Sequence, residues 1–198
     1  PIPGALENFN YGFKEVGGTQ AYTVYRGKDE ILQDVAAKLS DYASTPIDPK
    51  SEMIITPGTQ GALFLAVGAT VTRGDKVAII EPDYYANRKL VHFFQGDLVS
   101  VQLDYLNHED KAGINLDELE NSFKDGVKTF IFSNPNNPSG VVYSKEEVTQ
   151  IAELLKKYDV TVIVDELYSR QLFDGRDYTH LASLNIVPKD NIVTIIGP

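Results

Sequence analysis

Apolar residues in this chain recur alternately at helical spacing and in short continuous runs, so the pattern predicts helices and strands in turn. Apolar positions three and four residues apart predict helices over residues 31–42, 58–72, 84–94, 116–123 and 144–158. Short runs rich in Val and Ile predict strands over residues 53–55, 76–80, 98–103, 128–133, 161–164 and 191–196. The last two runs are almost wholly apolar, which is typical of parallel strands covered on both faces. The expected fold is therefore α/β, a three-layer α/β/α sandwich with a mainly parallel sheet.

Capping residues indicate where two of these helices begin. Ser144 and Glu147 stand three residues apart ahead of an apolar stripe, which predicts a capping box. Asn115 precedes the helix over residues 116–123 and predicts a second N-cap. Residues 1–27 are rich in Gly, Asn and Tyr without a clear period, so we expect an arm or an irregular lead-in there.

Composition narrows the class of protein. The chain of 198 residues is 42% hydrophobic and 23% charged, as in an ordinary soluble globular protein. Its net charge of -10 argues against nucleic-acid binding, because such surfaces need clustered Lys and Arg. No apolar run approaches the roughly 20 residues of a membrane helix and no signal pattern opens the sequence, so we expect a cytosolic protein without a membrane partner. The absence of cysteine excludes disulfides and thiolate catalysis, and three scattered histidines give little basis for a metal site.

Polar side chains follow two of the buried runs, at the points where strands should end. Asn137 lies in the stretch from Ser133 to Gly140, and Asp165 directly follows an apolar run, with Tyr168 three residues further on. Ligands of open α/β sheets bind outside the carboxyl ends of the strands, so these three residues are candidate site residues. An unpaired carboxylate beside a buried sheet is costly, so Asp165 needs a cationic or donor partner. A backbone N–H at a helix start is the alternative partner for Asp165, and turn or packing roles are the alternatives for Asn137 and Tyr168.

A glycine-containing helix start is the candidate anion site. Gly58, Thr59 and Gln60 follow a predicted strand, and a helix start presents unpaired backbone N–H groups to a phosphate. A tight strand-to-helix turn is the alternative interpretation. The glycine patterns of dinucleotide and nucleoside-triphosphate loops are absent, which argues against those ligands. Tyr84 follows another predicted strand and offers a ring for stacking, although a packing role is the usual one for a tyrosine taken alone.

In order and spacing these motifs resemble the fold-type I pyridoxal-phosphate enzymes, in particular the class I and II aminotransferases related to aspartate aminotransferase. The resemblance covers nearly the whole chain and rests on Tyr22 with Gly27, Thr56 to Leu63, Gly74 with Asp75, Glu81 to Tyr84, Asn134 to Gly140, and Asp165 to Tyr168. It implies the cofactor pyridoxal 5'-phosphate, bound by Gly58, Thr59, Gln60, Tyr84, Asn137, Asp165, Tyr168 and Tyr22. It also implies catalytic roles for Asp165, Tyr168 and Asn137.

The resemblance implies a contact for each of these residues. Asp165 would pair with the protonated pyridine nitrogen, which keeps the ring electron-poor. Asn137 and Tyr168 would donate hydrogen bonds to the phenolic oxygen, and Tyr84 would cover one face of the ring. The helix start would hold the phosphate, joined by Tyr22 from the other subunit. We therefore expect a homodimer with a shared active site.

The implied activity is transfer of an amino group between an amino acid and a 2-oxo acid. A pyridoxal-phosphate lyase, an amino-acid cyclase and a non-catalytic binding module of the same fold are the alternatives, because the fate of the reaction depends on groups beyond this chain. In relatives a Schiff-base lysine follows a strand such as residues 191–196, and a carboxylate-binding arginine lies in the C-terminal small domain; this chain has no counterpart of either. We therefore expect an N-terminal portion of a longer enzyme, inactive alone, in which residues 1–45 form an arm and the first helix and residues 46–198 form an incomplete cofactor-binding large domain.

Overall fold

The computed structural model describes residues 3–16, 24–106 and 111–197. These residues fall into two units. The first unit holds the described residues up to 42 together with residues 46–55, and the second holds residues 43–45 and 56–197.

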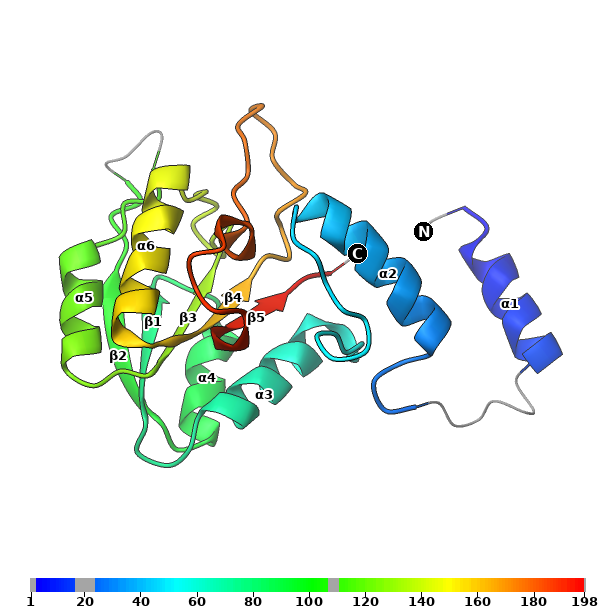
Figure 1. The fold of residues 1–198 in the computed structure, drawn as a ribbon, viewed down its shortest axis with the longest axis horizontal. Coiled ribbons are helices and arrows are strands. Elements are labelled where there is room, and N and C mark those ends of the chain that lie inside the picture. The colour runs from blue at the N-terminus through cyan, green and yellow to red at the C-terminus, as the bar shows by residue number, and fades with distance from the viewer. Residues whose placement is uncertain (1–2, 17–23, 107–110, 198) are drawn as a thin grey trace. The chain divides into compact units, whose positions relative to one another are not determined.

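The N-terminal segment is more regular than the sequence pattern predicts. Helix α1 spans Ala5–Val16, where we expected an irregular lead-in, and α2 spans Asp29–Tyr42, close to its predicted bounds (Figure 1). Leu6 and Phe9 stand three residues apart on α1 and are both 68% exposed. Leu6, Phe9, Phe13 and Val16 do follow helical spacing, but they cover only about three turns and stand among the Gly, Asn and Tyr residues on which the prediction of an irregular lead-in is based.

The predicted strand over residues 53–55 was wrong. This segment belongs to the first unit, where Ile55 donates its backbone N–H to the carbonyl of Arg26 at 2.9 Å. Ile54 and Ile55 remain exposed. A run of three apolar residues carries almost no periodicity, so it cannot distinguish a sheet strand from an extended connection.

The second unit alternates helices and strands along the chain (Figure 1). Its elements are α3 (Gly58–Thr70), β1 (Lys76–Glu81), α4 (Tyr85–Phe93), β2 (Asp97–Gln102), α5 (Leu116–Lys124), β3 (Thr129–Ser133), α6 (Lys145–Tyr158), β4 (Thr161–Asp165), two 3-10 turns at Leu181–Leu184 and Lys189–Asn191, and β5 (Ile192–Ile195). Apart from the strand over residues 53–55, every predicted element is present with ends shifted by at most two residues.

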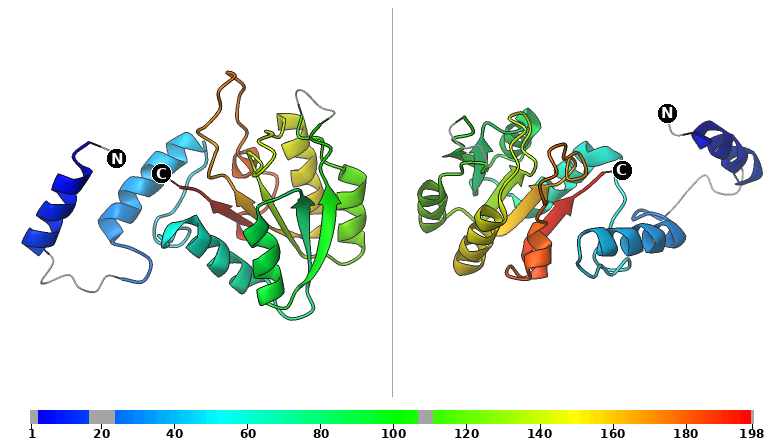
Figure 2. Two further views of the ribbon diagram at one scale, coloured as in Figure 1. Left: turned by 180° about the vertical axis from the view of Figure 1, so that it is seen from behind. Right: turned by 90° about the horizontal axis from the view of Figure 1, so that it is seen from above.

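The strands form one parallel sheet in the order β2-β1-β3-β4-β5. Parallel neighbours need a crossover connection, and helices provide most of these connections here. Helices α3 and α4 cover one face of the sheet, and α5 and α6 cover the other (Figures 1 and 2). The expected three-layer sandwich is thereby confirmed. Within the described ranges, none of the helices combines the length and apolar character needed to cross a bilayer.

Alternation along the central strands divides the core in two, because successive side chains of a strand point to opposite faces. Ile131 and Ile163 pack with α3 and α4, whereas Phe130, Phe132 and Val162 pack with α5 and α6. All five side chains are fully or almost fully buried. Each such burial stabilises the fold by about 1.5–3 kcal/mol, which explains why these runs contain so few polar residues.

Both predicted helix caps are confirmed. The Ser144 hydroxyl accepts the backbone N–H of Glu147 at 3.2 Å, and the Glu147 carboxylate accepts the backbone N–H of Ser144 at 2.8 Å. Asn115 caps α5 with its side-chain oxygen. Glu147 also accepts the backbone N–H groups of Ala112 and Gly113, at 3.0 and 2.8 Å. One buried carboxylate therefore both begins α6 and holds the segment that leads into α5.

Candidate active site

The carboxyl ends of β1, β3 and β4 bring the candidate side chains to one edge of the sheet. The register pairs Ser133 with Asp165, and the backbone N–H of Asn134 donates to the carbonyl of Asp165 at 2.9 Å. Asp165 and Tyr168 both lie close enough to Tyr84 for their charges to act on its hydroxyl. Residues far apart in the sequence therefore meet at this edge, as the strand pattern predicts.

Asp165 is half-buried at the end of β4. Its Oδ1 atom accepts the backbone N–H of Leu167 at 3.1 Å, so the backbone partner that the sequence left open does exist. The second carboxylate oxygen has no hydrogen-bond partner among the described residues. Burial raises the pKa of Asp165, the bond from Leu167 opposes that rise, and the charge of Glu166 adds to it. A partly desolvated carboxylate with one unused oxygen is suited to holding a cationic donor.

Two tyrosines near Asp165 are not fully buried, although Tyr84 also packs against the apolar cluster that lies under α3 and α4. The Tyr84 hydroxyl donates to Gln60 Oε1 at 3.4 Å, and the Tyr84 ring meets the Tyr85 ring edge-on with centroids 4.8 Å apart. A hydrogen bond with Tyr85 and desolvation raise the pKa of Tyr84, with further contributions from the charges of Tyr85, Tyr168 and Asp165. Tyr168 is 37% exposed. Gln60 and Tyr84 also line a surface hollow of about 510 Å³ that α3 and α4 form.

The start of α3 leaves backbone donors available. Pro57, at the N-cap position, makes no side-chain capping bond, and Gly58 adopts φ +74°, a conformation that favours glycine. The Gly58 N–H donates to the carbonyl of Thr56 at 2.7 Å. The N–H groups of Thr59 and Gln60 have no partner in the part of the chain that the structure describes. An added Cβ on Gly58 would meet no atom within 4 Å, so the space beside this turn is open.

The turn after β3 separates its asparagines into two kinds. Asn134 and Asn136 are buried, and their side-chain oxygens accept the backbone N–H groups of Tyr143 and Ser139, at 3.1 and 3.2 Å. Asn137 is half-buried and donates only its backbone N–H, to Ser133 Oγ at 3.1 Å. Its side-chain amide has no partner within residues 3–16, 24–106 and 111–197. The sequence could not tell these asparagines apart, whereas the structure leaves Asn137 available for a ligand. The peptide bonds before Pro135 and Pro138 are cis.

Sequence reasoning gave no role to Asp83, the residue before Tyr84. Its Oδ1 atom accepts the Tyr84 N–H and the Ser133 hydroxyl, both at 2.8 Å, and its Oδ2 atom accepts the Asn87 side-chain amide at 2.9 Å. Burial raises the pKa of Asp83 to about 6; these three hydrogen bonds oppose the rise, and the charge of Asp165 adds to it. The available signal was its position, because Asp83 also follows a buried strand.

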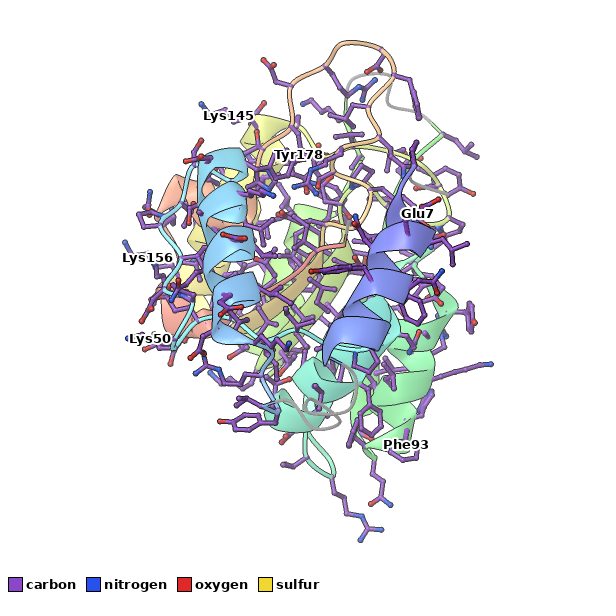
Figure 3. The ribbon with its side chains drawn as sticks, turned by 90° about the vertical axis from the view of Figure 1, so that its right-hand side faces the viewer. Glu7, Lys50, Phe93, Lys145, Lys156 and Tyr178 are labelled. Atoms are coloured by element: carbon purple, nitrogen blue, oxygen red, sulfur yellow. The ribbon has the colours of Figure 1, made fainter. Side chains whose placement is uncertain are left out.

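A buried pair behind the site also escaped sequence reasoning. His180 Nδ1 lies 2.6 Å from Glu166 Oε2, and both side chains are buried. Tyr178, labelled in Figure 3, donates its hydroxyl to the carbonyl of Asn134 at 2.7 Å. These contacts hold the loop after β4 against the strand ends that carry Asp165 and the Asn turn. Their partners are far apart in sequence, so no local pattern marks them.

Comparison with known proteins decides the family. The family model described as "Aminotransferase class I and II" matches residues 1–196. The chain belongs to this family. An aspartate aminotransferase of Sulfolobus acidocaldarius is 37% identical over 161 residues, which cover 81% of this chain and 40% of the relative. The crystal structure of an aspartate aminotransferase from Rhodobacter sphaeroides aligns with a TM-score of 0.96 and 56% identity, over 100% of this chain and 51% of that chain.

A second solved structure bears on the cofactor. Cystalysin from Treponema denticola, whose crystal structure contains pyridoxal 5'-phosphate, aligns with a TM-score of 0.78 and 25% identity, over 96% of this chain and 48% of that chain. The chain thus spans about half the length of the proteins it matches. Pyridoxal 5'-phosphate is the cofactor of this aminotransferase family, and the donor set of the site fits it. The unused oxygen of Asp165 suits a protonated ring nitrogen, and the open start of α3 suits a phosphate.

One assignment predicted from the sequence stays outside these observations. Tyr22 lies outside the described residues, so its contact with the phosphate of another subunit remains a prediction. Among the described residues, no group of three His, Asp or Glu side chains is placed to hold a metal ion.

Proposed function

We propose that this chain forms the cofactor-binding part of an aminotransferase that moves an amino group between an amino acid and a 2-oxo acid. The observation that carries the proposal is the half-buried carboxylate of Asp165, which keeps one oxygen unused beside Tyr84 and Tyr168. The family match supports transfer over the alternative lyase, cyclase and binding-module functions, since relatives such as the Sulfolobus acidocaldarius protein are named aspartate aminotransferases.

Each side chain has a distinct task in this proposal. Asp165 holds the proton on the ring nitrogen, and Asn137 and Tyr168 donate hydrogen bonds to the phenolic oxygen. The backbone N–H groups of Thr59 and Gln60 bind the phosphate. When bound, pyridoxal phosphate supplies an electron-poor ring that accepts the electrons of a bond broken at the substrate α-carbon.

The proposal places the remaining catalytic groups in a longer protein. A Schiff-base lysine and an arginine for the substrate carboxylate would come from sequence beyond these 198 residues, and this chain alone would not turn over substrate. The relatives support this interpretation, because the chain spans only 40% of the Sulfolobus acidocaldarius enzyme.

The experiment that tests the function uses the longer protein with L-aspartate and 2-oxoglutarate. We expect glutamate and oxaloacetate in equal amounts, without ammonia. Release of ammonia in place of glutamate would support a lyase. A purified protein that binds no pyridoxal phosphate would overturn the whole proposal.

We also propose a homodimer in which Tyr22 completes the phosphate site of the other subunit. Co-expression of Tyr22→Ala with Asp165→Ala tests it, because a mixed dimer carries both defects in one site and neither in the other. Random assembly should restore about a quarter of the wild-type activity. Mixing that restores none argues for independent sites. The cytosolic location remains a prediction from the sequence.

A further inference from the structure

The Asp83 carboxylate binds donors from three parts of the site at once. Its Oδ1 atom accepts the backbone N–H of Tyr84 and the hydroxyl of Ser133, and its Oδ2 atom accepts the amide of Asn87. Tyr84 precedes α4, Asn87 is fully buried within α4, and Ser133 ends β3. Asp83 therefore joins the turn after β1 to the end of the neighbouring strand.

Ser133 extends this connection to Asn137. Its hydroxyl donates to Asp83 Oδ1 at 2.8 Å and accepts the backbone N–H of Asn137 at 3.1 Å. One hydroxyl can make both bonds, because it carries one donor hydrogen and two lone pairs. Asn136 ties the same two turns together by donating its side-chain amide to the carbonyl of Pro82 at 3.2 Å. Tyr84 and Asn137 thus depend on the same carboxylate oxygen.

Asp83 does not need to touch the cofactor to affect it. Tyr84 would cover one ring face and Asn137 would donate to the phenolic oxygen, so their separation sets how the ring fits. A hydrogen bond to a carboxylate is shorter and stronger than one between neutral groups, which makes this connection stiff. Asp165 from β4 and Tyr143 from the segment before α6 are the titratable groups whose charges interact with Asp83.

We propose that Asp83 is a positioning residue for pyridoxal phosphate, which fixes Tyr84 directly and Asn137 through the hydroxyl of Ser133. This inference rests on the proposed function, since it concerns how the chain holds that cofactor. It makes Asp83 and Ser133 two parts of one connection, so their effects on binding are coupled.

The test measures the affinity of the longer apoprotein for pyridoxal phosphate and the induced circular dichroism of the bound cofactor. Assays run near pH 8, where Asp83 is ionised. We expect Asp83→Ala to raise the dissociation constant about tenfold, the loss typical of one hydrogen bond to a charged group, and to change the dichroism. Asp83→Asn should weaken binding less than Asp83→Ala, because its amide oxygen can still accept the bonds from Tyr84 and Ser133, although it loses the charge and the bond from Asn87. Ser133→Ala should weaken binding, and adding it to Asp83→Ala should cost little more.

Asp75→Ala is the matched control. The Asp75 carboxylate also accepts a backbone N–H and a hydroxyl, both from Thr72 at 2.7 Å, but it lies before β1 at the opposite edge of the sheet. We expect this variant to bind pyridoxal phosphate like wild type. Thermal melting of every variant shows whether a lower affinity comes from a less stable fold. If Asp83→Ala does not fold, the affinity of Ser133→Ala still tests the proposal.

Three results would overturn the positioning role while leaving the proposed function intact. They are wild-type affinity and dichroism in Asp83→Ala, additive effects in the double variant, and an Asp83→Asn variant as defective as Asp83→Ala. Failure of the wild-type protein itself to bind pyridoxal phosphate would instead remove the proposed function.

Discussion

At the residue scale, the site depends on which polar atoms the fold has already satisfied. Asn134 and Asn136 use their side-chain oxygens to accept bonds from their own turn and its continuation, whereas the side chain of Asn137 has no such partner among the described residues. Asp165 divides its two oxygens in the same way, with one bonded to the Leu167 N–H. Both unused groups are only partly buried, so a ligand with a matching donor or acceptor can replace the water at them.

Substituting Asp165 by Asn removes the charge and keeps the bond from Leu167. We expect the dissociation constant for pyridoxal phosphate in the longer protein to rise about 10- to 100-fold, because a hydrogen bond between charged groups contributes about 1.5–3 kcal/mol. Absorbance titration measures the constant. Asp97→Asn, at the exposed start of β2, is the control and should bind like wild type. Equal affinity in both variants would contradict the ion pair.

The raised pKa of Asp83 leads us to predict that the stability of the fold depends on pH. Its folded-state pKa of about 6 lies above the ordinary value of 3.8, so the folded protein binds more protons than the unfolded one between these limits. The contribution of Asp83 to the free energy of unfolding is therefore greatest below the lower limit and falls as pH rises through the window. Urea unfolding at a series of pH values should show Asp83→Asn gaining stability relative to wild type as pH rises from about 4 to 6. A constant difference would contradict the raised pKa.

At the element scale, the ends of helices and strands carry the function while their interiors carry the fold. The register of β3 with β4 sets Asp165 beside Ser133, and the open start of α3 presents its donors. The start of α6 shows the opposite arrangement, since its capping box is closed by Glu147 and held by further backbone donors. An uncapped helix start in this fold is therefore a feature of the site, in contrast to the capped structural start of α6.

Replacement of Glu147 by Ala should lower the free energy of unfolding by about 2–3 kcal/mol, because buried N–H donors lose their acceptor and the helix loses its cap. Its neighbour Glu146 lies in the same first turn of α6 but is exposed, so Glu146→Ala is the matched control. We expect Glu146→Ala to change stability by less than about 0.5 kcal/mol. Urea unfolding of both variants gives the comparison, and equal losses would show that Glu147 acts through charge at the helix start alone.

The sequence predicted long periodic elements well and tertiary contacts poorly. The continuous apolar runs at β3 and β4 could only be buried, so their positions and the polar residues after them followed from local pattern. The run at residues 53–55 was too short to decide its structure. Asp83 escaped because Ser133 comes from another strand, and the Glu166–His180 pair escaped because its residues lie 14 positions apart in a loop without regular spacing.

At the scale of the whole molecule, binding and stability are linked. A cofactor that binds only the folded site raises the free energy of unfolding by an amount set by its concentration relative to its dissociation constant. The net charge of -10 on this chain repels the negatively charged phosphate. The backbone donors at the start of α3 must therefore outweigh that repulsion locally.

Pyridoxal phosphate at 100 times its dissociation constant should therefore stabilise the longer protein by about 2.7 kcal/mol. Pyridoxal, which lacks the phosphate, should stabilise it much less at the same concentration, because the N–H groups of Thr59 and Gln60 then gain no acceptor. Thermal melting with each compound measures the difference. Equal shifts would show that the start of α3 does not bind the phosphate.

The strand order also has a consequence for how the protein folds. Val77 of β1 pairs with Leu98 of β2 on one side and with Thr129 of β3 on the other, so the sheet grows away from β2 in the direction of synthesis. Among the strands that the structure describes, no two neighbours are joined by a hairpin, so each pairing must close a long loop before its contacts form. Folding should therefore be slow, and its intermediates should contain incomplete sheets whose edge strand has not yet paired with its next neighbour.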